Sequence, residues 1–596
     1  MRPVVFDGCF GWLHPAAGSR GVVLCAPHGY EELCVHRQLA GLAERIAATG
    51  LPTLRFDYRG TGDSLGNDEE PQRLRAWIDS VRDAVRFMRR ELGVAEITLV
   101  GVRLGGTLAA LAARELRDID GLALLAPVES GRIYAREMKV LEAFSLQVEN
   151  APAPAPQHAN DIEAAGFVLT EETVAALRQV DLRQLDRAPA RRVLLLDPAA
   201  HGESGLADRL RDLGADVEVA PFEGFDRFIC EVHYGQRTPE AAFGTLIDWL
   251  GRDAPAPAEA RRPRVVARLE GPHAIETPVF FGPGARLVGT TCEPRPAAAD
   301  RDAPAVLFVN TGHHHRIGVN RMAVDMGRRL AARGITSMRI DVTGLGDSPA
   351  SAGRPENEVY DKRACGDVRA AIDCLEAQGH RDVVLIGLCS GAYVSFYTAL
   401  EDTRVVSQVL INMQKFVWRK GDSLATAVRT GSKRASDLGG DVLAAFGKTD
   451  RLLGLLKGGR REWHAVWALL HRACEWTGSA VGHATHALFG IEGEVARSFR
   501  LLGDLGTDTL LVYSVGDPGL VELELHRLRR SGEGIDGLRR VRVEMIDGAD
   551  HTLSLRPSRE RLAAILEAHL KARPPAVEAP APALRPAATV RPIRAA

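Results

Sequence analysis

The chain has 596 residues, of which 45% are hydrophobic and 26% charged. Because a single domain seldom exceeds roughly 300 residues, we expect at least two domains, each with a substantial core. The 75 Lys and Arg residues nearly balance the 77 Asp and Glu residues, which leaves a net charge of -2. This composition excludes fibrous, collagen-like and wholly disordered proteins, and the balanced charge argues against nucleic acid as a partner.

The nine cysteines include no Cys-x-x-Cys pair, which indicates reduced thiols rather than a zinc or redox site. The first residues, MRPVVFDG, lack the basic and apolar regions of a secretory leader, and no stretch of 18 apolar residues occurs. We therefore expect a cytoplasmic protein with no membrane span.

Short β-branched apolar segments alternate with stretches of helical periodicity, a pattern typical of parallel sheets covered by helices. In the first part of the chain, strands are predicted at 21–27, 52–57, 97–102, 121–127, 192–197 and 216–222. In the second part, they are predicted at 305–310, 336–341, 382–388, 406–412, 508–515 and 540–546. Residues 251–264 form a Pro- and Ala-rich linker between the parts, and the tail 571–596 is predicted to be disordered.

The second part of the chain repeats the first. Two segments of the first part return in the second: LPTLRFDYRGTGDS (51–64) as ITSMRIDVTGLGDS (335–348), and ITLVGVRLGG (97–106) as VVLIGLCSGA (383–392). Further on, LLLDP ends at 198 and its counterpart SVGDP at 518, so the offset has grown from 286 to 320, a difference of 34 residues. We therefore expect two tandem domains, a first copy at 1–250 and a second, larger copy at 265–570.

In the second copy, a predicted strand runs through GLCSG into a stretch of helical periodicity. This arrangement is typical of a nucleophile elbow, in which Gly387 and Gly391 permit a tight turn that exposes the central residue, Cys389. The amide of Ser390, at the start of the helix, would help to hold an oxyanion. The alternatives are that Cys389 is an ordinary buried thiol, or that Ser390 is the nucleophile, although Ser390 is out of frame with both glycines.

A candidate acid and a candidate base follow the elbow in the chain order nucleophile, acid, base, which is the order found in proteins with a nucleophile elbow of this kind. Asp517 follows the predicted strand 508–515, and His551 follows the predicted strand 540–546. His551 would deprotonate the Cys389 thiol, and Asp517 would fix the imidazole tautomer and balance its charge. Asp550, adjacent to His551, is the competing acid.

The motifs DYRGTGDS, GVRLGG, DVTGLGDS, GLCSGA and GADH resemble the α/β-hydrolase superfamily. In particular, the chain resembles tandem-domain bacterial members that are allied to the exosortase A system-associated hydrolases and to the serine aminopeptidase S33-like branch. The resemblance implies two tandem α/β-hydrolase domains, each a mostly parallel sheet flanked by helices, and a role in exopolysaccharide or related secondary biosynthesis. Most members use Ser at the elbow, so Cys389 is a departure, similar to the cysteine of dienelactone hydrolases and polyester synthases.

In this fold, the loop after the strand at 305–310 supplies the second oxyanion amide, for which Thr311, Gly312 and His313 are the candidates. Metal binding by the adjacent residues His313, His314 and His315 is disfavoured, because neighbouring side chains point apart and no carboxylate motif accompanies them. We expect neither a metal nor a cofactor.

The first copy has lost the nucleophile. Aligning the repeats puts Arg103 at the elbow position and Arg227 at the position of the base, whereas Asp197 keeps the position of the acid. A guanidinium is neither a nucleophile nor a base at neutral pH, so we expect a pseudo-enzyme domain that serves as a docking partner. The alternative is that Arg103 and Arg227 clamp an anion. His233 could replace the base but has no nucleophile to activate.

The extra residues enlarge the segment 415–502, where α/β-hydrolases place a lid. Its first twenty residues carry six basic side chains and one acidic side chain, which could form a basic rim or merely a solvated face. The predicted rim consists of Arg419, Lys420, Lys433 and Arg434. An apolar stripe of helical spacing follows at Trp463, Trp467, Leu470 and Cys474.

Together these features predict an acyl hydrolase that cleaves a small-molecule ester or thioester, including CoA-bound or carrier-bound acyl groups, through an S-acyl-Cys389 intermediate. Two alternatives remain open. One is an acyltransferase that uses the same three residues, and the other is a non-enzymatic two-domain binding protein.

Overall fold

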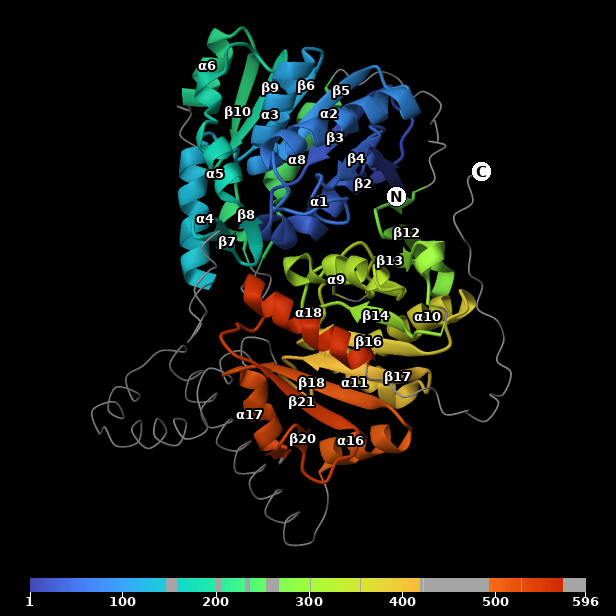
Figure 1. Ribbon diagram of the computed structural model, residues 1–596. Coiled ribbons are helices and arrows are strands. Elements are labelled where there is room, and N and C mark those ends of the chain that lie inside the picture. Colours follow the sequence, from blue (N-terminus) through green and yellow to red (C-terminus); the bar gives the residue numbers. More distant parts are fainter. Residues whose placement is uncertain are drawn as a thin grey trace, which may run out of the picture.

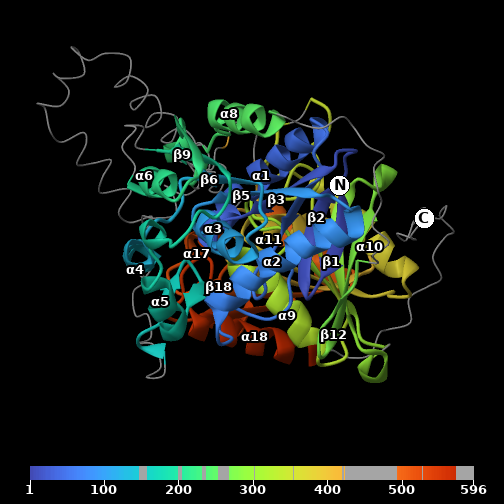
Figure 2. The same ribbon diagram turned by 90° about the horizontal axis from the view of Figure 1, so that it is seen from above.

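The computed structural model describes residues 1–145, 158–198, 205–230, 236–252, 267–300, 302–353, 355–418, 422, 493–526 and 528–571. These residues form two α/β domains, one for each copy. Figure 1 shows the first copy (blue to green) stacked on the second (yellow-green to red), and Figure 2 shows from above that the two overlap. The predicted architecture of two mostly parallel sheets flanked by helices is confirmed.

The first copy contains an eight-stranded sheet of order β1-β2-β4-β3-β5-β6-β9-β10. The β1–β2 and β2–β4 pairings are antiparallel, and the others are parallel. The strands are β1 (Arg2–Phe6), β2 (Cys9–His14), β3 (Arg20–Cys25), β4 (Thr53–Phe56), β5 (Glu96–Val102), β6 (Gly121–Leu125), β9 (Arg192–Asp197) and β10 (Asp216–Pro221). A separate hairpin is formed by β7 (Ile162–Ala164) and β8 (Phe167–Leu169).

Helices cover both faces of this sheet because each presents an apolar stripe. In α2, for example, Trp77, Val81, Ala84 and Met88 recur at helical spacing and are fully buried. One face is covered by α1 (Tyr30–Ala48), α7 (Phe225–Phe228) and α8 (Glu240–Gly251). The other is covered by α2 (Arg73–Leu92), α3 (Leu104–Leu116), α4 (Gly131–Ser145), α5 (Glu171–Arg178) and α6 (Gly205–Asp212).

The second copy repeats this order within an eleven-stranded sheet, β11-β12-β13-β15-β14-β16-β17-β18-β21-β20-β19. The strands are β11 (Leu269–Glu270), β12 (Ala274–Phe281), β13 (Leu287–Pro294), β14 (Ala305–Val309), β15 (Ser337–Asp341), β16 (Val383–Leu388), β17 (Val405–Ile411), β18 (Asp508–Ser514), β19 (Arg530–Ser531), β20 (Gly534–Ile535) and β21 (Val541–Ile546). The helices are α9 (Met322–Ala331) and α18 (Arg556–Lys571) on one face, and α10 (Ala364–Ala377), α11 (Ser390–Glu401), α16 (Glu494–Asp504) and α17 (Pro518–Leu525) on the other.

All twelve predicted strands are present, but the antiparallel strands at the start of each copy were not predicted. β2 and β12 are interrupted by residues that obscure a strand pattern, among them Gly11 in β2 and Glu276 and Pro278 in β12. Pro278 lies in an antiparallel strand near the edge of the sheet, where a missing amide donor is tolerated.

The two copies meet through a reciprocal exchange of buried ion pairs. Arg55 of β4 donates to Asp347 in the second copy, and Arg339 of β15 donates to Asp63 in the first copy, with Nη2 2.6 Å from Oδ1. The repeat aligns Arg55 with Arg339 and Asp63 with Asp347, both at an offset of 284 residues (339 minus 55, 347 minus 63). The interface therefore has the self-complementary form of a two-fold dimer, within one chain.

Arg316 lies at the centre of this interface. Its guanidinium is 2.5 Å from Asp63 of the first copy and 2.7 Å from Asp347 of the second. It also lies over the rings of Phe10 and Trp12 of the first copy, at 5.6 and 5.4 Å from the ring centroids. Because both Arg316 and its carboxylate partners are excluded from water, the charges compensate one another within the interface.

Several predicted segments lie wholly or partly outside the described residues. These are most of the linker 251–264, the tail 571–596 beyond Lys571, and residues 419–421 and 423–492 of the predicted lid 415–502. The ends of the lid segment that are described belong to the core, because Phe416 packs against Phe499 of α16 with ring centroids 5.6 Å apart. Within the described residues, no helix combines the length and the apolar character that a membrane span requires.

Candidate active site

Cys389 occupies a strained turn between β16 and α11. Its φ of 55° and ψ of -112° are rarely adopted by a residue with a side chain, and such conformations persist only where the surroundings enforce them. Arg103, the aligned residue of the first copy, has nearly the same conformation, with φ 51° and ψ -124°. Both copies therefore build the elbow, although only the second carries a cysteine there.

The elbow glycines are required by close packing. A Cβ atom on Gly387 would lie 2.3 Å from the carbonyl group of Gly391. A Cβ atom on Gly391 would lie 2.4 Å from the carbonyl oxygen of Asn310, in the loop after β14. No side chain fits at either position, so these glycines allow the start of α11 to pack directly on the strand ends.

His551 lies beside Asp517, with 2.6 Å between Nδ1 and Oδ2. The other carboxylate oxygen of Asp517 accepts a hydrogen bond from the amide of Gly519 at 2.7 Å and thereby caps α17. The Asp517 side chain is fully buried. The carboxylate of Asp550 instead accepts the amides of Thr552 and Ser554, so it stabilises the turn after His551. This geometry favours Asp517 over Asp550 as the partner of the imidazole.

The electrostatics of the site favour a thiolate–imidazolium pair. Burial would raise the pKa of the Cys389 thiol, but the charge and hydrogen bond of His551 outweigh it and lower that pKa below its ordinary value. Burial would lower the pKa of His551, but Cys389 and Asp517 raise it well above its ordinary value. The His551 side chain keeps 29% of its surface exposed, so it can reach a substrate.

Tyr360 was not anticipated from the sequence. Its hydroxyl lies 3.3 Å from the Cys389 sulfur, and burial raises the pKa of Tyr360 well above its ordinary value, so the hydroxyl keeps its proton. The ring stacks on Trp418 at 4.5 Å and lies edge-on to Tyr393. Tyr360 has a positive φ of 56° and lies outside any motif, so no sequence signal marked it.

The predicted oxyanion loop packs directly on the elbow. The amide of Gly312 donates a hydrogen bond to the hydroxyl of Ser390 at 2.8 Å. In this arrangement the Gly312 amide does not point at an oxyanion. The Ser390 hydroxyl therefore fixes the loop, and Gly312 is the weakest of the three candidate loop amides. The backbone amides of Ser390, Thr311 and His313 stay candidates for the oxyanion hole.

In the first copy, the two aligned arginines, Arg103 and Arg227, have different surroundings. Arg103 is bonded within the domain to two carboxylates, with Nε 2.9 Å from Glu31 and Nη2 2.5 Å from Glu137. Arg227 lies in α7 with 58% of its side chain exposed, 4.0 Å from Asp226. Because the carboxylates beside Arg103 already compensate its guanidinium, its contacts argue against the alternative in which Arg103 and Arg227 clamp an anion. Asp197 ends β9, as predicted for the acid position, and His233 lies outside the described residues.

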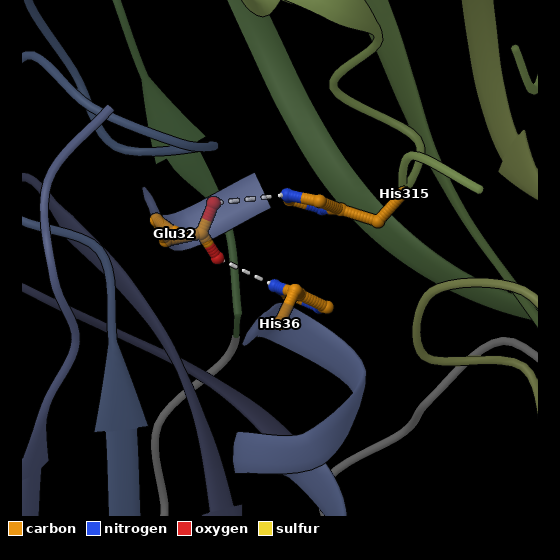
Figure 3. A group of neighbouring side chains, drawn as sticks. All are labelled: Glu32, His36 and His315. Carbon is orange, nitrogen blue, oxygen red and sulfur yellow. Dashed lines mark hydrogen bonds and ion pairs between the residues drawn. The ribbon is translucent and has the colours of Figure 1, made fainter. Parts of the chain in front are cut away.

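Figure 3 shows a cluster at the interface between the copies, in which Glu32 of α1 faces His36 of the same helix and His315 of the second copy. The carboxylate is 2.7 Å from His36 Nδ1 and 3.4 Å from His315 Nε2. The two rings stack with centroids 3.7 Å apart and an interplanar angle of 9°. A metal ion lies in the plane of each imidazole that binds it, so two rings in separate parallel planes cannot share one ion. As arranged, the cluster is a hydrogen-bonded contact.

A cavity of about 780 Å³ lies between the copies. His28 and Tyr58 of the first copy and Asn320 and Arg559 of the second are among its lining residues, but none of the three predicted catalytic residues lines it. The chemistry of the elbow therefore lies elsewhere. The predicted rim residues Arg419, Lys420, Lys433 and Arg434 and the apolar stripe fall outside the described residues, so the lid stays a prediction.

Comparison with known proteins identifies the fold of both copies. Residues 18–196 match the family model described as serine aminopeptidase, S33, and residues 306–565 match that of the alpha/beta hydrolase family. The chain therefore belongs to the α/β hydrolases, and it is a hydrolase enzyme with two such domains in tandem.

Solved structures of α/β hydrolases are similar to parts of the chain. Est1E from Butyrivibrio proteoclasticus, solved with ferulic acid bound, is 17% identical with a TM-score of 0.31, and the alignment covers 42% of this chain and 100% of that one. XC6422 from Xanthomonas campestris, described as a serine hydrolase without a lid, is 14% identical with a TM-score of 0.29, covering 52% of this chain and 99% of that one. No curated protein matches the chain.

Proposed function

We propose that the second copy hydrolyses an acyl ester or thioester through an S-acyl intermediate on Cys389. One observation carries the proposal. Cys389 occupies a strained elbow next to an imidazole that is itself paired with a buried carboxylate, Asp517, at 2.6 Å. Nucleophile, base and orienting acid in contact are the arrangement that covalent acyl transfer requires.

The reaction follows from these roles. The Cys389 thiolate attacks the carbonyl carbon and a C–S bond forms. The resulting oxyanion accepts a hydrogen bond from the backbone amide of Ser390. When the intermediate collapses, the bond to the leaving oxygen or sulfur breaks, and that atom takes the proton from His551 Nε2. Water then attacks the S-acyl group while His551 accepts a proton from it, the C–S bond breaks, and the carboxylic acid leaves.

The ionisation of the thiols makes the proposal testable by alkylation. Burial raises the pKa of Cys9 and Cys292 to about 12 and that of Cys365 to about 11, whereas the pKa of Cys389 is lowered. Iodoacetamide at neutral pH should therefore label Cys389 first, and His551→Ala should slow that labelling. Faster labelling of another cysteine, or no effect of the His551 change, would refute the assignment.

Intact-mass spectrometry tests the intermediate itself. Incubation with short-chain p-nitrophenyl esters and acyl thioesters should add one acyl group to the full chain, mapped to Cys389, and Cys389→Ala should abolish both the adduct and turnover. Arg103→Ala is the control, because the first-copy elbow should not take part in the chemical step. Product analysis with an added alcohol or thiol distinguishes hydrolysis from acyl transfer.

A further inference from the structure

The start of α18 carries an unfavourable charge of its own. The helix begins RPSRER, so Arg556 and Arg559 lie in its first turn, where the helix dipole favours acids, and no acidic residue lies in that turn. The preceding residue, Leu555, has no side-chain oxygen that could cap the helix. The loop that carries His551 leads directly into this helix. The way in which the start of α18 is capped therefore affects the position of that loop.

The first copy supplies the missing carboxylates. Glu163 of β7 accepts the amide of Arg556 at 2.9 Å and the guanidinium of Arg559 at 2.8 Å, both on Oε1. Asp161 accepts from Arg556 at 2.9 Å, and Glu69 accepts from it at 3.0 Å. Glu163 thus acts as an N-cap for a helix of the other domain, and Figure 1 shows the β7–β8 hairpin reaching down to α18.

Two side chains connect this contact to the loop that carries His551. Arg559 Nη1 donates to the carbonyl of Gly166, in the β7–β8 turn, at 2.8 Å, and also to the carbonyl of Ser554. Asn320 Nδ2 donates to the carbonyl of Thr552 at 3.1 Å. Asn320 also packs against Gly166, where a Cβ atom would lie 2.1 Å from its Oδ1.

We propose that the β7–β8 hairpin of the first copy positions the catalytic base of the second copy, with Glu163 as the positioning residue. Glu163 caps α18 across the interface, and through Arg559 it fixes the loop in which His551 must face both Asp517 and Cys389. This inference rests on the proposed function, since it assigns His551 as the base. It gives the inactive first copy a role in the reaction of the second.

The test compares Glu163→Ala and Glu163→Gln in the full chain. We expect amides of 549–556 to exchange hydrogen faster in Glu163→Ala, and Cys389 alkylation at pH 7 to slow roughly 2- to 30-fold, the range for residues that act on a site through others. At about pH 10, where the thiol ionises without help, the rates should converge. Glu163→Gln keeps an acceptor for the Arg556 amide and should show a smaller effect.

Arg37→Gln is the matched control. Arg37 of the first copy donates to Gly346 and Glu356 of the second, so its loss also weakens the interface, and neither of these partners belongs to α18 or to the His551 loop. A folded Glu163→Ala protein with wild-type exchange in 549–556 and a wild-type alkylation profile would overturn the proposal. If Cys389 is not the fastest thiol in the wild type, the proposed function fails instead, and the exchange measurement still tests the positioning.

Discussion

Tyr360 contacts the predicted nucleophile although no motif surrounds it. A neutral hydroxyl 3.3 Å from a thiolate donates to it, and Tyr360 keeps its proton because burial raises its pKa. A hydrogen bond of this kind stabilises the charged form of the sulfur relative to the thiol. We therefore expect Tyr360, together with His551, to favour the ionised form of Cys389.

Replacing Tyr360 with Phe tests this role. The ring can keep its stacking on Trp418, so we expect the loss of about 1 kcal/mol of thiolate stabilisation and a roughly fivefold slower alkylation of Cys389 at neutral pH. Tyr397→Phe is the control, because the Tyr397 hydroxyl donates to the carbonyl of Phe416 instead. Equal rates in the wild type and Tyr360→Phe would show that the hydroxyl does not act on the thiolate.

At the scale of elements, the elbow depends on how closely α11 approaches the strand ends. Two glycines at i-2 and i+2 of Cys389 leave no gap that a methyl group could fill. The first copy keeps the same glycines and packs equally closely, with a Cβ on Gly105 only 2.2 Å from the carbonyl of Ala26. The elbow is therefore a packing feature of the fold that persists in the first copy, where Arg103 replaces the cysteine.

Gly391→Ala should destabilise the protein by about 3 kcal/mol or more, because the new methyl group meets the backbone of Asn310 and not a movable side chain. Gly366→Ala, in α10, is the matched control. A Cβ on Gly366 meets nothing within 4 Å, so this change should stabilise the helix by about 0.5–1 kcal/mol. Urea unfolding measures both. Similar effects of the two changes would contradict the packing argument.

In the whole molecule, buried ion pairs join the two copies, and each copy contributes an arginine and an aspartate to them. Asp63 and Arg339 are each only 1% exposed. Removing one partner of such a pair leaves the other charge buried and uncompensated. The aligned pair of Arg55 and Asp347 is also buried, so we expect substitutions in either pair to destabilise the interface to a similar extent.

Asp63→Ala and Asp347→Ala should each lower the free energy of unfolding by about 3–5 kcal/mol, the usual cost of breaking a buried ion pair from one side. Asp118→Ala provides the comparison, because Asp118 pairs with Arg89 at the surface of the first copy and should contribute at most about 1 kcal/mol. Chemical unfolding of the three variants checks this. If Asp63→Ala lowered the free energy of unfolding no more than Asp118→Ala does, the buried ion pairs would not stabilise the interface.

The His36 cluster makes the interface sensitive to pH. Burial would lower the pKa of His36, but Asp347 and Glu32 raise it from 6.5 to about 10, and its ring stacks on His315. A raised folded-state pKa contributes stability that is complete below pH 6.5 and is lost as pH rises to about 10. The pKa of Glu32 is lowered by its histidine partners against the effect of burial, and that contribution is lost on acidification.

We therefore expect stability to fall steadily between pH 6.5 and 10. His36→Gln should flatten this decline, because a neutral side chain removes the proton linkage while keeping polar groups beside Glu32 and Asp347. Urea unfolding at intervals across this range, for both proteins, measures the difference. Parallel pH profiles would show that His36 does not carry the linkage.

Much of the fold and part of the site follow from local patterns. The twelve central strands are short apolar runs between glycine turns, and the repeat itself revealed two domains. The elbow, Asp517 and His551 could be predicted because each follows a strand whose end faces the same edge of the sheet. Tyr360 could not, because it lies 29 residues before Cys389, in a segment without periodicity.

The two α/β copies, their alignment and the replacement of Cys389 by Arg103 in the first copy can be read from the sequence alone, since they depend on periodicity and on residues close along the chain. Which charges are buried, and with which partners, depends on how the two copies pack together. Glu163 and Arg559 are 396 residues apart, and Arg55 and Asp347 are 292 residues apart. Such pairs form only when the copies dock, and a charged residue that will be buried against a distant partner has the same local pattern as one that faces water.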